Sequence, residues 1–177
     1  MRIVGLLRGI NVGTSVKVPM KELKALLEGL GMANVMTYLN SGNVIFDSEQ
    51  EPGQLTSIIE TELEGRFGQR IPILLLDSAT VIAVRDAIPV EWENSEHEQT
   101  YVAYLFPEAD RPGLIPEFPI KHQYVDMRYV PSAIICNIQR ADNNKSQITK
   151  IAGHASYAKM TTRNVNTARK LAELCGG

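Results

Sequence analysis

The sequence has no long hydrophobic run, and none of its apolar segments approaches the ~20 residues that a helix needs to cross a bilayer. Between Arg2 and Arg8 the N-terminus holds only about five apolar residues, which are too few for the apolar region of a signal peptide. We therefore expect a cytoplasmic protein that does not enter the membrane.

Cysteine and histidine are also scarce, and they occur singly. Cys136 lies in an apolar stretch and Cys175 near the C-terminus, and neither has a second cysteine or a histidine at metal-site spacing. His97, His122 and His154 are equally isolated, so we predict no metal site. The glycine motifs of dinucleotide-binding and P-loop proteins are missing, as is the nucleophile elbow of hydrolases. The sequence therefore predicts no cofactor and identifies no catalytic residue.

The first 76 residues alternate short apolar runs with two amphipathic segments. Pro19 and Gly31 bound the first amphipathic segment, and Pro52 and Gly68 bound the second, as at helix starts and ends. Each segment carries one apolar stripe, so we predict one antiparallel sheet with both helices on one face and the first strand internal. The expected order is that of a ferredoxin-like β-α-β-β-α-β unit: strands 3–7, 35–39, 44–46 and 71–76, with helices 19–30 and 52–67.

The rest of the chain is harder to interpret, but it mixes helix and strand patterns in the same way. We expect an α+β protein with a ferredoxin-like half, residues 1–76, packed with a second α+β half, residues 77–177. The expected elements are a helix 78–88 capped by Asp77 or Ser78, an acidic loop from Glu91 to Glu98, a strand 100–106, an irregular proline-rich segment 107–119, a hairpin of strands 124–129 and 133–138, and helices 145–152 and 164–174.

Three short motifs carry a family resemblance. LLRGINVG runs from Leu6 to Gly13, SGNV from Ser41 to Val44, and TTRN from Thr161 to Asn164. Together they resemble the signatures of the bacterial domain-of-unknown-function family 1697, and they span nearly the whole chain. The resemblance implies a two-part α+β fold and no established activity.

Two polar connections are predicted to meet at one end of the first sheet. A right-handed β-α-β crossover makes strands 3–7 and 35–39 parallel, so the connections that follow them lie at the same end. Glycines there allow backbone N–H groups to point outward, and cations and amides add further donors, which together favour phosphate or carboxylate. The candidate ligand-binding residues are Arg8, Asn11 and Lys17 in the loop 8–18, and Asn40, Ser41 and Asn43 in the turn 40–43.

The TTRN motif provides a second candidate anion site. We expect a threonine to cap the following helix and Arg163 to lie in its first turn, where N–H groups and the helix dipole attract anions. Residues 141–177 carry six basic and two acidic side chains, a net charge of +4. Thr162, Arg163 and Asn164 therefore join the candidate set, and we expect the three segments to converge on one anion-binding cleft between the halves.

Every one of these residues also has a purely structural interpretation. Glycine serves backbone angles that other residues avoid, while threonine, serine and asparagine are common in caps and turns. Arg8 would then be an ion-pair tie to a carboxylate of the second half. For a single residue the structural interpretation is favoured, and only the convergence of the set indicates a site.

Two other classes of function compete with anion binding. Ferredoxin-like domains that bind RNA present aromatic residues on their central strands, whereas strand 3–7 has none and strand 44–46 has only Phe46. With a net charge of −2 as well, we expect no nucleic-acid partner. The main alternative is a protein-interaction or self-assembly module without catalysis, which the proline-rich segment 107–119 would suit.

Overall fold

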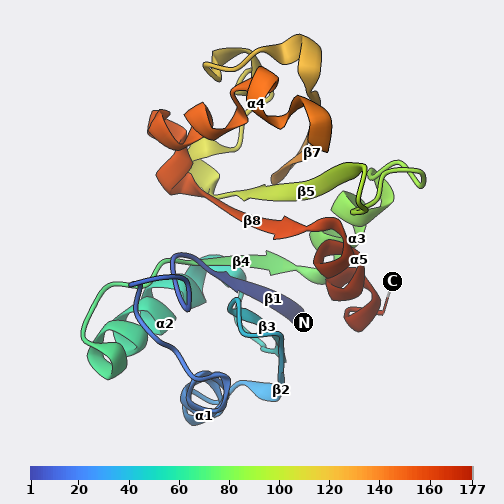
Figure 1. Ribbon diagram of the computed structural model, residues 1–177. Coiled ribbons are helices and arrows are strands. Elements are labelled where there is room, and N and C mark those ends of the chain that lie inside the picture. Colours follow the sequence, from blue (N-terminus) through green and yellow to red (C-terminus); the bar gives the residue numbers. More distant parts are fainter. Residues whose placement is uncertain (177) are drawn as a thin grey trace. The chain divides into compact units, whose positions relative to one another are not determined.

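Two four-stranded antiparallel sheets form the framework of the computed structural model, which describes residues 1–176 (Figure 1). Each sheet belongs to its own unit of the chain. The first unit contains residues Met1–Val81 and the C-terminal residues from Leu174, and the second contains Ile82–Glu173. The chain is therefore α+β, as predicted.

The first unit has the predicted β-α-β-β-α-β order, with the sheet order β2-β3-β1-β4. The first strand lies inside the sheet, between β3 and β4, and all three pairings are antiparallel. This is the arrangement of a ferredoxin-like unit. Its elements are β1 (Arg2–Leu7), α1 (Met20–Gly29), β2 (Ala33–Tyr38), β3 (Asn43–Asp47), α2 (Pro52–Phe67) and β4 (Ile73–Asp77).

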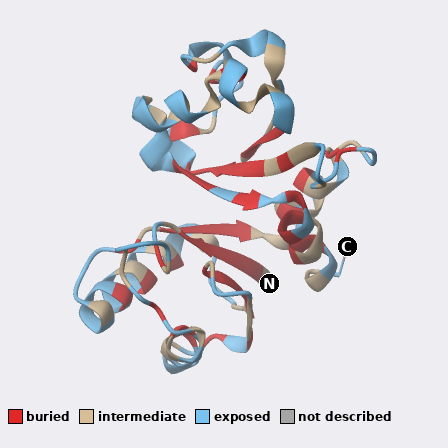
Figure 2. Cartoon of the chain, in the orientation of Figure 1, coloured by how far each residue is buried: buried red, intermediate tan, exposed pale blue. Residues whose placement is uncertain are grey.

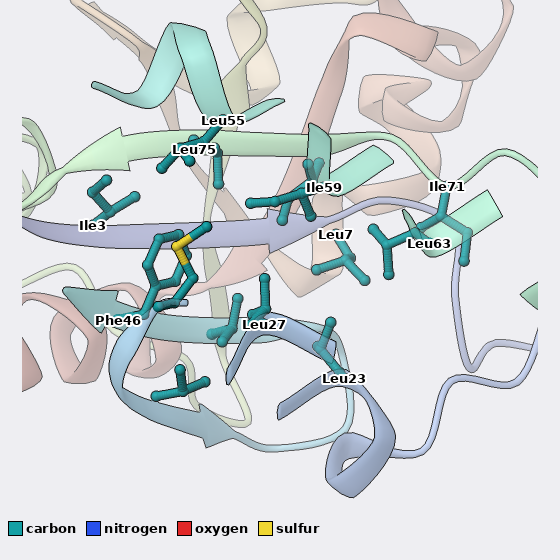
Figure 3. Close-up of a cluster of buried hydrophobic side chains, with 14 of the residues drawn as sticks. Ile3, Leu7, Leu23, Leu27, Phe46, Leu55, Ile59, Leu63, Ile71 and Leu75 are labelled. Atoms are coloured by element: carbon teal, nitrogen blue, oxygen red, sulfur yellow. The ribbon is translucent and has the colours of Figure 1, made fainter. Parts of the chain in front are cut away.

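Both helices of this unit pack on the same face of the sheet, as their apolar stripes predict. Leu23 and Leu27 of α1 are fully buried, and leucine and isoleucine side chains of α2 join them in one core. Figure 3 shows these side chains meeting Ile3, Leu7 and Phe46 of the sheet. Burial of each such side chain is worth about 1.5–3 kcal/mol, so this core is the main stabilising element of the unit.

The opposite face of the first sheet is buried as well. Val4, Leu6 and Ile45 alternate with the residues of the helix-covered face, and none of the three is exposed to solvent. The continuous apolar run of β1 is thus explained by a strand that is buried on both sides.

The second unit repeats the strand order of the first, with β6-β7-β5-β8 in place of β2-β3-β1-β4. Short 3-10 helices replace the long helices between its strands. The strands and α-helices are α3 (Ser78–Asp86), which begins in the first unit, β5 (Glu98–Leu105), β6 (Asp126–Val130), β7 (Ala133–Gln139), α4 (Asn143–Ser146), β8 (Met160–Asn164) and α5 (Val165–Leu174). The 3-10 helices are Pro107–Ala109, Ile115–Glu117, His122–Tyr124, Arg140–Asp142, Ile148–Gly153 and Ala155–Lys159.

Two of the predicted elements in this unit are wrong. The helix expected at 145–152 is broken at Gln147, whose left-handed backbone (φ 56°) separates the short α4 from a 3-10 helix. Glu98 was expected in an acidic loop but begins β5, where its carboxylate accepts a hydrogen bond from Asn137 on β7. Figure 2 shows the inner strands of both sheets as mostly buried and the segments around α4 as largely exposed.

Candidate functional site

The loop 8–18 and the turn 40–43 lie together at one end of the first sheet. The N–H of Leu7 donates to the carbonyl of Gly42 at 2.9 Å, and Nδ2 of Asn11 donates to the carbonyl of Asn40 at 2.7 Å. The adjacency that the crossover rule predicts is therefore present in the structure.

Asn11 is the residue that holds the loop in this conformation. Its Nδ2 also donates to the carbonyl of Val18 at 2.9 Å, and its Oδ1 accepts from the N–H of Val18 at 2.8 Å. Its φ of 56° lies in the left-handed region, which asparagine tolerates better than most residues do. The amide of Asn11 is thus used within the protein.

The turn 40–43 is stabilised in a similar way. Asn43 is fully buried, and its Nδ2 donates to the carbonyl of Tyr38 at 2.8 Å and to Oγ of Ser41 at 2.9 Å. Gly42 has a φ of +83°, and a Cβ there would lie 2.7 Å from Cβ of Leu7. Asn43 and Gly42 therefore have structural roles in the turn, while the side chain of Asn40 is exposed.

The two cations of the loop are placed differently from each other. Arg8 is half-buried, and its backbone N–H donates to the carbonyl of Pro72 at 2.9 Å. Lys17 is exposed, and its Nζ donates to the carbonyl of Gly13 at 3.1 Å. This contact holds the ammonium group over the tip of the loop, beside the exposed Gly13 and Thr14.

The expected threonine cap near the C-terminus is wrong. Residues Met160–Asn164 form β8, and β-branched Thr161 and Thr162 pair with β5 there, as suits their strand preference. The helix begins one step later, at Val165, and Oδ1 of Asn164 accepts from the N–H of Thr167 at 2.9 Å. Asn164 is therefore the N-cap, and Arg163 precedes the helix instead of lying in its first turn.

Because neighbouring residues of a strand point to opposite faces, this motif is divided between two environments. Thr162 and Asn164 point to one face of the second sheet, and both are exposed. Arg163 points to the other face and is buried, with Nη1 donating to Oγ1 of Thr161 and to the carbonyl of Thr162, both at 2.9 Å. Burial lowers the pKa of Arg163 to about 10, so the guanidinium is still charged at neutral pH.

The face that carries Thr162 and Asn164 holds a pocket of about 490 Å³ that sequence reasoning missed. Its floor is set by the strand register, in which Ala103 pairs with Ile134 and Thr162 while Tyr101 pairs with Cys136 and Asn164. The 3-10 helix Ile148–Gly153 supplies part of the wall. One signal was available in the sequence, since Ala103 is a small residue within a strand and leaves room above the sheet.

Two titratable side chains on the pocket floor, Tyr101 and Cys136, are held in their neutral forms. Burial raises the pKa of the Cys136 thiol to about 12, and it raises the pKa of the Tyr101 hydroxyl well above its ordinary value. The neighbouring Cys136 raises the pKa of Tyr101 further. At neutral pH the pocket floor therefore carries no charge.

Residues 1–176 offer neither a metal-binding cluster nor a membrane-spanning helix. No group of three or more histidine, cysteine, aspartate or glutamate side chains there is arranged to hold a metal ion. Among the helices of that range, none has the length and apolar character needed to cross a membrane.

Comparison with known proteins gives a fold and a family. The chain is similar to the solved structure of conserved bacterial protein SP0830 from Streptococcus pneumoniae, with a TM-score of 0.85 and 25% sequence identity over 98% of each chain. No curated protein matches the sequence. Residues 1–130 match the family model described as "Protein of unknown function (DUF1697)". That match covers more than half of the chain, and the chain therefore belongs to this family of proteins of unknown function.

Proposed function

We propose that the protein binds a small phosphate- or carboxylate-bearing anion at the loop 8–18 and the adjoining turn 40–43. The observation that carries the proposal is the hydrogen bond from Asn11 to the carbonyl of Asn40, which joins the two connections. A loop that is fixed in this way presents its donors to an anion without first paying the entropy of ordering itself.

The donors available for the anion differ from those that the motif alone suggests. Within residues 1–176, the exposed N–H groups of Gly13 and Thr14 donate no hydrogen bond, and Lys17 places its ammonium group next to them. Consecutive N–H groups around a left-handed residue form a concave anion site, and the φ of Gly13 is +52°. Arg8 adds a guanidinium, which suits planar or tetrahedral oxyanions. In this proposal Asn11, Ser41 and Asn43 shape the site, and Arg8, Lys17 and the side chain of Asn40 contact the ligand.

Arg163 lies in the second unit and is proposed as a separate candidate for anion contact. Its guanidinium is charged at neutral pH, and its hydrogen bonds to Thr161 and Thr162 fix its orientation. Thr162 and Asn164 point to the opposite face of their strand and are not expected to contact the same anion as Arg163.

The test is a titration of the full chain with inorganic phosphate and with citrate, followed by calorimetry and by backbone amide NMR. Arg8→Ala and Lys17→Ala should each weaken binding by about tenfold or more, since a charge-assisted hydrogen bond contributes about 1.5–3 kcal/mol. Lys21→Ala is the matched control, because Lys21 is exposed on α1 and its replacement removes the same charge. Its affinity should stay within about twofold of wild type, as for a distant surface charge.

The same titration can overturn the proposal. Equal weakening by Lys21→Ala would show that only the overall charge matters, and unchanged amide signals at residues 8–18 would place any anion elsewhere. If Arg163→Ala lowers the melting temperature and leaves the anion affinity unchanged, Arg163 is a structural residue. If no anion binds and the molecular mass in solution rises with protein concentration, the alternative function of a protein-interaction or self-assembly module is favoured instead.

A further inference from the structure

We propose that the pocket on the second sheet binds an uncharged, amphipathic small molecule, independently of the anion proposed for the first unit. The pocket lies over the face that carries Tyr101, Ala103 and Thr162, and its volume is about 490 Å³. Sites for small organic ligands commonly measure ~300–1,000 Å³. The pocket thus has the size of a binding site for a compact organic molecule.

The absence of charge in the lining selects against ions. The lining residues include no aspartate, glutamate, lysine, arginine or histidine. An ion that entered would lose its hydration and find no opposite charge, which is strongly unfavourable. Tyr101 and Cys136, the groups able to ionise on the floor, are held neutral by burial. A neutral ligand is therefore the one that this lining accepts.

The distribution of polar groups points to a ligand with two different ends. Gln99 on β5 and Thr162 on β8 line the pocket, and within residues 1–176 neither side chain makes a hydrogen bond. They can donate to a ligand and also accept from it. Across the floor, Ile134 and Ile138 of β7 supply apolar contact, joined by Ile151 from the 3-10 helix. A molecule with an apolar body and one hydrogen-bonding group matches both parts.

Part of the pocket wall, at Phe118, is held in place by the protein itself. Phe118 packs edge-to-face against His154, with 5.3 Å between the ring centroids. His154 is itself fixed, because its Nδ1 accepts from the N–H of Ser156 at 3.1 Å and caps the 3-10 helix Ala155–Lys159. Aromatic pairs of this kind add about 0.5–1.5 kcal/mol beyond the area they bury. This part of the wall therefore does not need to be ordered by the ligand.

Two dyes that share an aromatic body and differ in charge test the proposal. N-phenylnaphthylamine is neutral and fluoresces strongly in apolar sites, and anilinonaphthalene sulfonate is its anionic counterpart. We expect one neutral dye molecule to bind per chain, with an affinity about tenfold or more above that of the sulfonate, a difference of about 1.4 kcal/mol. Inorganic phosphate should not displace the neutral dye, because the anion site is a separate one.

A pocket-filling variant and its control locate the binding. Ala152 lines the pocket but is itself exposed, so Ala152→Trp should obstruct the pocket without overpacking a core. Ala158→Trp places the same side chain on the neighbouring 3-10 helix, at an exposed residue outside the lining. The first variant should lower the affinity for the neutral dye by about tenfold or more, and the second should change it by less than about twofold.

Amide NMR of the wild-type chain with the neutral dye gives an independent reading. Signals at Gln99–Ala103, Ile134–Ile138 and Ile148–Ala152 should shift, while those of the loop 8–18 should not. Failure of the neutral dye to bind, stronger binding of the sulfonate, or equal dye affinity in the two tryptophan variants would overturn the proposal. Loss of phosphate binding with intact dye binding would refute only the anion site.

Discussion

Replacing Asn11 with alanine should destabilise the first unit by about 2–4 kcal/mol. Two of its side-chain hydrogen bonds, both to Val18, are partly buried, and each is worth about 0.5–1.5 kcal/mol. The third, to the carbonyl of Asn40, is exposed and contributes less. Alanine must also adopt the left-handed φ of 56°, which costs it about 1 kcal/mol or more.

Two further substitutions at the same residue separate these contributions. Asn11→Gly loses all three hydrogen bonds but accepts the left-handed backbone, so it should be about 1 kcal/mol more stable than Asn11→Ala. Asn11→Asp keeps an oxygen that accepts from the N–H of Val18, but it cannot donate to the carbonyls of Val18 and Asn40. Its stability should therefore lie between those of wild type and Asn11→Ala.

Urea unfolding followed by far-UV circular dichroism measures these differences. The single tryptophan, Trp92, belongs to the second unit, so its fluorescence is a poor monitor of the first. Hydrogen exchange at the N–H of Val18 adds a local measurement, since that group loses its acceptor in Asn11→Ala and Asn11→Gly. A loss below about 0.5 kcal/mol in Asn11→Ala would show that the loop is held by other contacts, because it is smaller than a typical single hydrogen bond.

Gly42→Ala should cost about 2–5 kcal/mol in urea unfolding, because the new Cβ would sit 2.7 Å from Leu7 and 2.8 Å from Ile10 at a φ of +83°. Gly65→Ala, in open space within α2, should instead stabilise the protein by about 0.5–1 kcal/mol, and a loss there would contradict the steric argument. Burial raises the pKa of the Cys136 thiol from 9.0 to about 12 in the folded protein. Above pH 9 the thiol therefore ionises in the unfolded chain but not yet in the folded one, and the free energy of unfolding falls as the pH rises. Between pH 9 and pH 10 wild type should lose about 1 kcal/mol more than Cys136→Ala, and parallel pH profiles would refute this.

The fold of the first unit could be predicted because local and tertiary signals agree. Proline and glycine mark the ends of α1 and α2, and the leucine stripe with Leu23 and Leu27 specifies which face packs. The second unit was predicted less well. The helix break at Gln147 depends on a left-handed backbone, which a glycine at that position would have indicated but a glutamine does not. Strand β8 was missed because it is short and precedes a helix directly.

The candidate site shows a different limit of sequence reasoning. Asparagine and serine bind ligands and brace turns with the same atoms, so their presence does not reveal which task they perform. Asn11 and Asn43 prove to use their amides within the protein, whereas Lys17 extends over an exposed loop tip. The pocket on the second sheet was missed because it depends on which strands are neighbours, and Tyr101 and Cys136 are far apart in the sequence.

The shared strand order of the two sheets makes the segments that cover them comparable parts. In the first unit α1 and α2 fill their face with side chains, and in the second unit short 3-10 helices occupy the equivalent connections and leave about 490 Å³ open. The segments that cover the two sheets are thus candidates for exchange by protein design. Helices with the lengths and apolar stripes of α1 and α2, grafted over the second sheet, should raise its stability and abolish its pocket, which is the usual trade between packing and binding.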